Sequence, residues 1–315
     1  METKTLAVVG IAVVLVAALA FVALTTEGEE AEYELITSSD AAMTSALQGA
    51  LDNREHIVVT LWSPHWAFAE FETDDYHLVY LEDPEGTFGA AENIVTYSSQ
   101  AFAADADNDD AKTILSNFNW SSEDFGAVLG HIEDKGAYDG AKHWVENEGA
   151  SLVSDWKAGI TGNDRGIELD LVYVDWACAI ASSNVMKVVL EDVGYDVKMT
   201  NVGANTMYTG LANDDYDFMT TAWLPVTHDE YIQDYGNDIV ELGISFTEAK
   251  LGLVVPNYTA EELGITSVAD LRGNGEHFDN KIIGIDAGAG LMRLTNQAME
   301  DYDLGKPSKE VEEAE

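Results

Sequence analysis

Short apolar segments alternate with segments of helical periodicity along most of the chain. The apolar segments are a few residues long and rich in Val, Ile and Leu, which is typical of buried strands, whereas 40–51, 109–157 and 179–193 have helical spacing. This alternation predicts an α/β fold with mainly parallel sheets, in which ligands bind beyond the carboxyl ends of the strands. The expected strands are 33–36, 56–61, 169–174, 196–202, 218–222 and 281–285.

The charge balance is strongly acidic. The 315 residues include 58 Asp and Glu against 15 Lys and Arg, which gives a net charge of -43. Nucleic acid is therefore excluded as a partner, because phosphate binding needs basic patches. A hydrophobic content of 46% argues against disorder. We expect a folded, halophilic protein, since molar salt screens repulsion between surface carboxylates within a few ångströms; an ordinary acidic protein is the alternative.

Residues 6–24 form an uninterrupted apolar run after Lys4. Its length is close to the roughly 20 residues that cross a bilayer, and it exceeds the usual apolar core of a signal peptide, although cleavage stays an alternative. We expect a membrane anchor with the folded body on the extracellular side. The only cysteine, Cys178, lies far from this run, which excludes lipid attachment, and its apolar neighbours indicate a buried thiol.

Three tryptophans, Trp62, Trp176 and Trp223, each stand directly after an expected strand. Because strand ends face the ligand crevice of an α/β sheet, we expect the three indoles to converge there. A single tryptophan is more typical of a core, but the shared placement favours a site. Indole faces bind quaternary ammonium groups, and each desolvated cation–π contact contributes about 2 kcal/mol. The tryptophans therefore predict a quaternary ammonium site.

A glycine-rich turn at 284–292 precedes an expected helix. Its glycines bring the backbone close to a ligand, and the helix N-terminus presents free N–H groups and a positive dipole end. A small carboxylate suits this arrangement, whereas the spacing matches neither a P-loop nor a dinucleotide fingerprint. His228 is a candidate for one more hydrogen bond to the carboxylate, although a lone histidine near a turn is more often structural.

Several segments together resemble the signature segments of glycine betaine-binding proteins of ABC importers; they are 61–66, 175–183, 222–228, 252–256 and 284–292. The resemblance covers nearly the whole chain after the apolar run. It implies a two-lobed, periplasmic-binding-protein-like (type II) fold with the ligand in the cleft between the lobes. It also implies a prism of tryptophans around a trimethylammonium head, with backbone amides and a histidine on the carboxylate. By motif match these residues are Trp62, Trp176, Trp223, Gly290, Leu291 and His228.

The order of the segments differs from the usual family pattern. In relatives, the segment that resembles 284–292, together with its helix, comes before the segment that resembles 33–66. This relation is a circular permutation, and it predicts that the two ends of the folded body are close in space. We expect one discontinuous lobe from 33–83 plus 256–304 and one continuous lobe from 84–255. Residues 1–32 would be the anchor and an acidic spacer, and 305–315 an acidic tail.

These observations predict the extracellular substrate-binding subunit of an ABC transporter that delivers glycine betaine to the permease and ATPase subunits. A choline or proline betaine receptor and a ligand sensor without transport are alternatives. An enzyme is disfavoured, because no nucleophile elbow or metal motif accompanies Asp175, Asp286 or Ser182. We expect no cofactor, no catalytic residue and no metal site, since acidic pairs such as 109–110 are typical of solvated loops.

Overall fold

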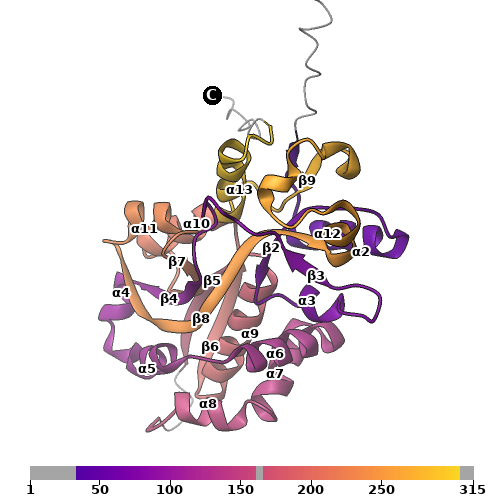
Figure 1. Cartoon of the computed structure of the whole chain (residues 1–315). Coiled ribbons are helices and arrows are strands. Elements are labelled where there is room, and N and C mark those ends of the chain that lie inside the picture. Colours follow the sequence, from indigo (N-terminus) through magenta and orange to yellow (C-terminus); the bar gives the residue numbers. More distant parts are fainter. Residues whose placement is uncertain (1–32, 161–165, 306–315) are drawn as a thin grey trace, which may run out of the picture.

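The computed structural model describes residues 33–160 and 166–305 (Figure 1). The expected membrane span at 6–24, the acidic spacer before residue 33 and nearly all of the expected acidic tail lie outside these residues. Within the described ranges, no helix is both long and apolar enough to cross a membrane.

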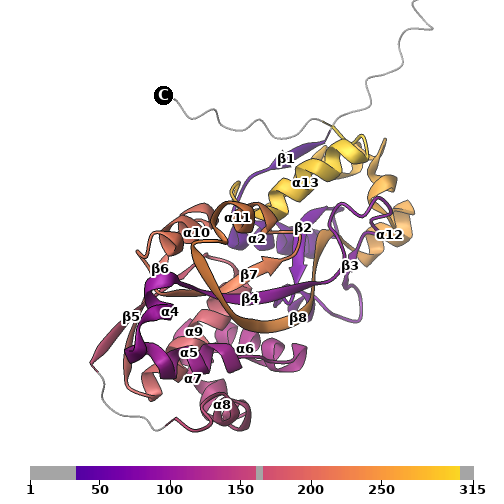
Figure 2. The same ribbon diagram turned by 90° about the vertical axis from the view of Figure 1, so that its left-hand side faces the viewer.

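The described strands form one sheet in the order β1-β9-β2-β8-β4-β7-β5-β6, with β3 also paired to β8. The strands are β1 (Glu34–Ile36), β2 (Val59–Ser63), β3 (Leu78–Tyr80), β4 (Glu92–Ser99), β5 (Ile167–Tyr173), β6 (Tyr195–Asn201), β7 (Phe218–Leu224), β8 (Ile239–Pro256) and β9 (Lys281–Ile283). Helices flank this sheet on both sides of the molecule (Figures 1 and 2).

The α-helices are α2 (Asp40–Asn53), α3 (Ala67–Glu70), α4 (Gln100–Ala104), α5 (Asp109–Asn117), α6 (Ser122–Lys135), α7 (Ala137–Glu146), α8 (Ala150–Trp156), α9 (Ala177–Asp192), α10 (Ala204–Ala212), α11 (Asp229–Tyr235), α12 (Asn257–Leu263) and α13 (Gly290–Asp301). Short 3-10 helices lie at η1 (Ala106–Asn108), η2 (Val268–Leu271) and η3 (Gly275–Phe278). The helical periodicity at 40–51, 109–157 and 179–193 is thus confirmed, and Ser39 caps α2 by accepting a hydrogen bond from the N–H of Ala42.

The long strand β8 joins two groups of elements. Its first part pairs with β4 up to Ala249, and its last part pairs with β2 and β3 from Lys250 onward. Figure 1 shows β8 curving from one group to the other. We call the group around β1, β2, β3, β9 and α13 the β9 side, and the group around β4 to β7 and α4 to α11 the β7 side. The change of pairing partner along β8, at 249–250, lies before the expected lobe boundary at 256.

The sheet is mixed rather than mainly parallel. The pairs β1–β9, β2–β9, β5–β6 and β5–β7 are parallel, but every pairing made by β4 or β8 is antiparallel. β4 and most of β8 were not predicted from the sequence because they carry polar residues, such as Glu92 and Glu241, and only the last part of β8, 251–256, is continuously apolar. They run antiparallel because the chain crosses between the two sides and returns.

The two ends of the described body lie side by side. The N–H of Tyr33 donates a hydrogen bond of 2.8 Å to the carbonyl oxygen of Leu304. Directly after it, β1 pairs in parallel with β9, which connects to α13 through the glycine-rich turn. The expected closeness of the ends is therefore confirmed.

Candidate ligand-binding site

One cavity lies where the β9 side meets the β7 side. Its empty space, part of which is open to solvent, is about 290 Å³. All six residues expected from the sequence line it, and five further residues complete the wall: Cys178, Thr227, Leu251, Ile285 and Ala289. The structure therefore brings together residues that are more than two hundred positions apart in the chain.

The three tryptophans reach the cavity from three different segments. Trp62 and Trp223 are the penultimate residues of β2 and β7, and Trp176 lies between β5 and α9. The expectation that each follows its strand is wrong for Trp62 and Trp223, because both strands continue one residue past the indole. Each tryptophan is at most 6% exposed, so a ligand cation among them would be desolvated.

Trp176 is oriented by a carboxylate from the opposite side of the cavity. Its indole N–H donates a hydrogen bond of 2.9 Å to Oδ1 of Asp286. Burial raises the pKa of the Asp286 carboxyl above its usual value, and the hydrogen bond from Trp176 offsets part of that rise. Asp286 is therefore the acceptor that fixes this indole and not an acid–base group of an enzyme.

His228 is buried and electrically neutral. It is 1% exposed, and burial lowers the pKa of its imidazole to about 3, with the charge of Arg293 adding to the shift. Its Nδ1 accepts a hydrogen bond of 3.1 Å from the backbone N–H of Trp223 and faces the hydroxyl of Tyr208 at 3.0 Å. A backbone N–H can only donate, so Nδ1 carries the lone pair and the proton is on Nε2.

The Nε2–H of His228 is left without an acceptor. Among the described residues, this buried atom has no hydrogen-bond partner. A buried donor without a partner costs about 1–3 kcal/mol, so an acceptor supplied by a ligand would be stabilised there. The structure therefore identifies the atom of His228 that would donate a hydrogen bond to a ligand, and shows that this atom carries the proton.

The glycine-rich turn places the first residues of α13, on the β9 side, against Thr227 on the β7 side. A Cβ atom on Gly290 would lie 2.1 Å from the carbonyl oxygen of Thr227, so only glycine permits this approach. The first N–H groups of a helix have no acceptor within the helix. The preceding residue, Ala289, makes no side-chain cap, which leaves the amides of Gly290 and Leu291 available to an anion.

Further polar contacts hold the β9 side to the β7 side around the cavity. Oδ2 of Asp40 accepts a hydrogen bond of 2.9 Å from the N–H of Ala177, at the start of α9. The hydroxyl of Tyr231 donates to the carbonyl oxygen of Gly288 at 2.8 Å, and Nη2 of Arg293 lies 2.9 Å from Oδ1 of Asp229. These contacts could not be predicted from the sequence, because no local pattern marks residues that pair across a cleft.

Cys178 and Ser182, two potential nucleophiles near the cavity, are not activated for catalysis. Burial raises the pKa of the Cys178 thiol to about 12, so it stays protonated, as its apolar neighbours predicted. The hydroxyl of Ser182 lies 3.1 Å from the carbonyl oxygen of Cys178 and 2.8 Å from the hydroxyl of Thr220. Neither residue is an activated nucleophile.

Comparison with known proteins decides the family. The model of the OpuAC family, described as the substrate-binding domain of ABC-type glycine betaine transport systems, matches residues 21–147 and 168–315. The chain belongs to this family. Members of the family are substrate-binding components of transporters and not enzymes.

Two relatives with similar sequences agree with this assignment. The chain is 37% identical over 245 residues to the glycine betaine/carnitine transport binding protein GbuC of Listeria monocytogenes, covering 78% of each protein. It is 30% identical over 127 residues to the glycine betaine/proline betaine-binding periplasmic protein of Salmonella typhimurium, covering 37% of this chain and 38% of that protein. A solved structure of lactococcal OpuAC with glycine betaine is 38% identical over 23% of this chain and 28% of its own, with a TM-score of 0.23.

Proposed function

We propose that this protein captures glycine betaine outside the cell and delivers it to the permease and ATPase subunits of an ABC importer. The proposal depends on one observation: a single cavity combines three buried indoles with unpaired donors for an anion. The trimethylammonium head would lie among Trp62, Trp176 and Trp223, where cation–π contacts replace its hydration. Bulk salt should weaken these short-range contacts less than it weakens an exposed ion pair.

The carboxylate end of the ligand would lie at the start of α13. It would accept hydrogen bonds from the amides of Gly290 and Leu291 and from Nε2–H of His228. The helix dipole adds a favourable interaction with the negative charge. A zwitterion would therefore have its positive end held by one set of residues and its negative end by the other.

Ligand binding would favour the closed arrangement of two lobes. We propose that the lobes comprise 33–83 plus 256–304 and 84–255, and that the chain is a circular permutation of the usual family order. Trp176, Trp223 and His228 belong to the second lobe, and Trp62, Gly290 and Leu291 to the first. A ligand that contacts both lobes stabilises the closed state by its differential contacts, and the permease could recognise that state.

Choline is the main rival within the same class of ligand. It carries the quaternary ammonium but has a neutral hydroxyl in place of the carboxylate, so it offers the buried Nε2–H of His228 only a neutral acceptor and pays the penalty of losing a charge-assisted hydrogen bond. That penalty favours a betaine over choline by roughly tenfold or more. Proline betaine and carnitine carry both groups and stay as alternatives, as does a ligand sensor without transport.

We also propose that residues 6–24 anchor the protein to the cell membrane and that its acidity is an adaptation to high salt. The apolar run has the length of a membrane-spanning helix, and the net charge of -43 suits a strongly screening solvent. In this arrangement the folded body lies on the extracellular side, where the ligand is captured.

Calorimetric titration in high salt tests the ligand assignment. We expect glycine betaine to bind, choline to bind at least tenfold more weakly, and proline not to bind. Trp176→Ala should weaken glycine betaine binding by more than tenfold, whereas Trp176→Phe should weaken it less because it keeps an aromatic face. An affinity that is unchanged in Trp176→Ala would contradict the proposed cage.

A further inference from the structure

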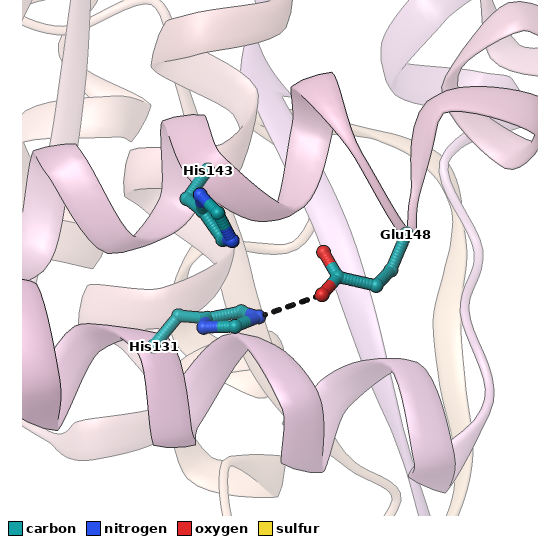
Figure 3. A group of neighbouring side chains, drawn as sticks. All are labelled: His131, His143 and Glu148. Carbon is teal, nitrogen blue, oxygen red and sulfur yellow. Dashed lines mark hydrogen bonds and ion pairs between the residues drawn. The ribbon is translucent and has the colours of Figure 1, made fainter.

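A second cluster of polar side chains lies on the helical part of the β7 side. His131 belongs to α6, His143 to α7, and Glu148 to the turn before α8. One potential ligand atom from each residue lies within 4.8 Å of the others. Figure 3 shows both imidazoles and the carboxylate directed toward a common point. None of the three lines the cavity described above.

Close backbone packing positions the two histidines. A Cβ atom on Gly140 would lie 2.5 Å from the carbonyl carbon and oxygen of His131, so α7 touches the backbone of α6 at this point. His143 stands one helical turn after Gly140 and therefore lies over His131. The two imidazole rings have centroids 4.6 Å apart and meet at 70°.

A buried tryptophan positions the carboxylate. The N–H of Gly149 donates a hydrogen bond of 2.8 Å to the carbonyl oxygen of Trp144, and a Cβ on Gly149 would collide with the Trp144 ring. This packing fixes the turn that carries Glu148. Its carboxylate faces Nε2 of His131.

We propose that His131, His143 and Glu148 bind one divalent transition-metal ion, with zinc as the best fit. Two imidazole nitrogens and one carboxylate oxygen, with water in the fourth position, form a known zinc ligand set. Imidazole ligands favour zinc, copper and nickel over magnesium and calcium. This ligand set was not expected from the sequence, because the spacing of its residues matches no common metal motif.

The distances are close to those that a bound ion requires. Tetrahedral bonds of about 2.1 Å place neighbouring ligand atoms about 3.4 Å apart. Nε2 of His131 already lies 3.2 Å from Oε1 of Glu148. All three ligand atoms lie within 4.8 Å of one another, so side-chain rotations that shorten the remaining distances by up to about 1.4 Å would complete the site. These side chains can rotate because they are partly open to solvent, His131 being 21% exposed and Glu148 52% exposed. The ion would clamp α6, α7 and the turn before α8 together.

Lys135 distinguishes a metal site from a simple histidine–carboxylate pair. Its Nζ lies 3.3 Å from Nδ1 of His131 and donates a hydrogen bond to the lone pair there. An imidazole bound to metal through Nε2 carries its proton on Nδ1, so it cannot accept that hydrogen bond. Metal uptake must therefore displace Lys135 into solvent, and removal of its charge should tighten metal binding.

Titration with Co²⁺ and then Zn²⁺, in about 1 M NaCl to screen weak carboxylate binding, tests the proposal. The wild-type protein should bind one equivalent of Co²⁺ with the visible absorption of a tetrahedral site, and Zn²⁺ should displace it. His131→Ala and His143→Ala should each weaken binding by at least tenfold. Lys135→Gln should bind several-fold more tightly, and glycine betaine affinity should stay unchanged in all three variants as a check on folding.

A matched control is available in His56 and His277, another pair of neighbouring imidazoles with centroids 6.3 Å apart. The variant with both residues changed to Ala should bind Co²⁺ as the wild type does. The proposal is overturned if the wild type binds no stoichiometric Co²⁺ or Zn²⁺. It is equally overturned if binding persists in His131→Ala and His143→Ala, or disappears in the control.

Discussion

The indole N–H of Trp176 donates a hydrogen bond of 2.9 Å to the carboxylate of Asp286, from the β7 side of the cavity to the β9 side. Asp286 lies four residues before Gly290, in the turn that leads into α13. One contact therefore links an aromatic wall of the proposed cation site to the turn that would hold the carboxylate. The two ends of the ligand site are consequently coupled through a bond that itself spans the cleft.

Removal of the Asp286 carboxylate should weaken ligand binding. Without its acceptor, the indole of Trp176 loses a charge-assisted hydrogen bond, and the cleft loses one closing contact. We expect Asp286→Ala to lower glycine betaine affinity about tenfold in calorimetry. Asp286→Asn keeps an acceptor oxygen and should lose less. Equal affinities for the wild type and Asp286→Ala would show that the hydrogen bond does not orient the cage.

Gly290→Ala should prevent the cleft from closing. The added Cβ would lie 2.1 Å from a backbone oxygen of Thr227, which cannot move aside as a flexible side chain can. We expect at least a tenfold loss of betaine affinity, with little change in the melting temperature of the ligand-free protein.

The matched control for this variant is Gly288→Ala in the same turn. A Cβ at Gly288 meets no atom within 4 Å, and the backbone there does not require glycine. Its affinity should therefore stay close to that of the wild type. If both variants lose affinity alike, the turn tolerates no side chain at all and the specific contact with Thr227 is not the cause.

The neutral state of His228 makes stability depend on pH. Its pKa is about 3 when folded and about 6.5 when unfolded, so between these values the unfolded chain binds one more proton. The free energy of unfolding contributed by this group is fully present above pH 6.5 and decreases as pH falls toward 3. From pH 7 to pH 5 the decrease is about 2 kcal/mol.

Urea unfolding of the wild type and His228→Gln between pH 5 and 7 measures this contribution. Glutamine can accept the hydrogen bond from the N–H of Trp223 but does not titrate. Carboxylates with raised pKa values, such as Asp286, are present in both proteins and cancel in the difference. Parallel pH profiles for the two proteins would mean that His228 is not the buried neutral group described.

High salt should stabilise the folded protein. With a net charge of -43, repulsion between surface carboxylates opposes folding, and raising NaCl from about 0.1 M to 1 M shortens the Debye length from about 10 Å to about 3 Å. We expect the melting temperature to rise steadily over this range, while betaine affinity changes little because indoles hold the cation. A melting temperature that is flat or falls with salt would argue for an ordinary acidic protein.

Local sequence patterns determined much of this protein. Apolar periodicity was enough to locate α2, α9 and the helices from α5 to α8, because burial of one face sets the spacing along a single element. The tryptophans near the ends of β2 and β7 and the glycines before α13 could also be recognised from their immediate neighbours in the sequence. These local signals identified the six expected residues, and packing of the separate elements brings them together in one cavity.

Other features were decided only by the tertiary structure. The pairing of β4 with β8, the hydrogen bond from Trp176 to Asp286 and the one from Ala177 to Asp40 join segments that are distant in sequence, the last two across 110 and 137 positions. The proton on Nε2 of His228 likewise follows from the backbone N–H that approaches Nδ1. Such contacts depend on how separate elements pack against one another, and no periodicity within one element encodes the identity of its partner.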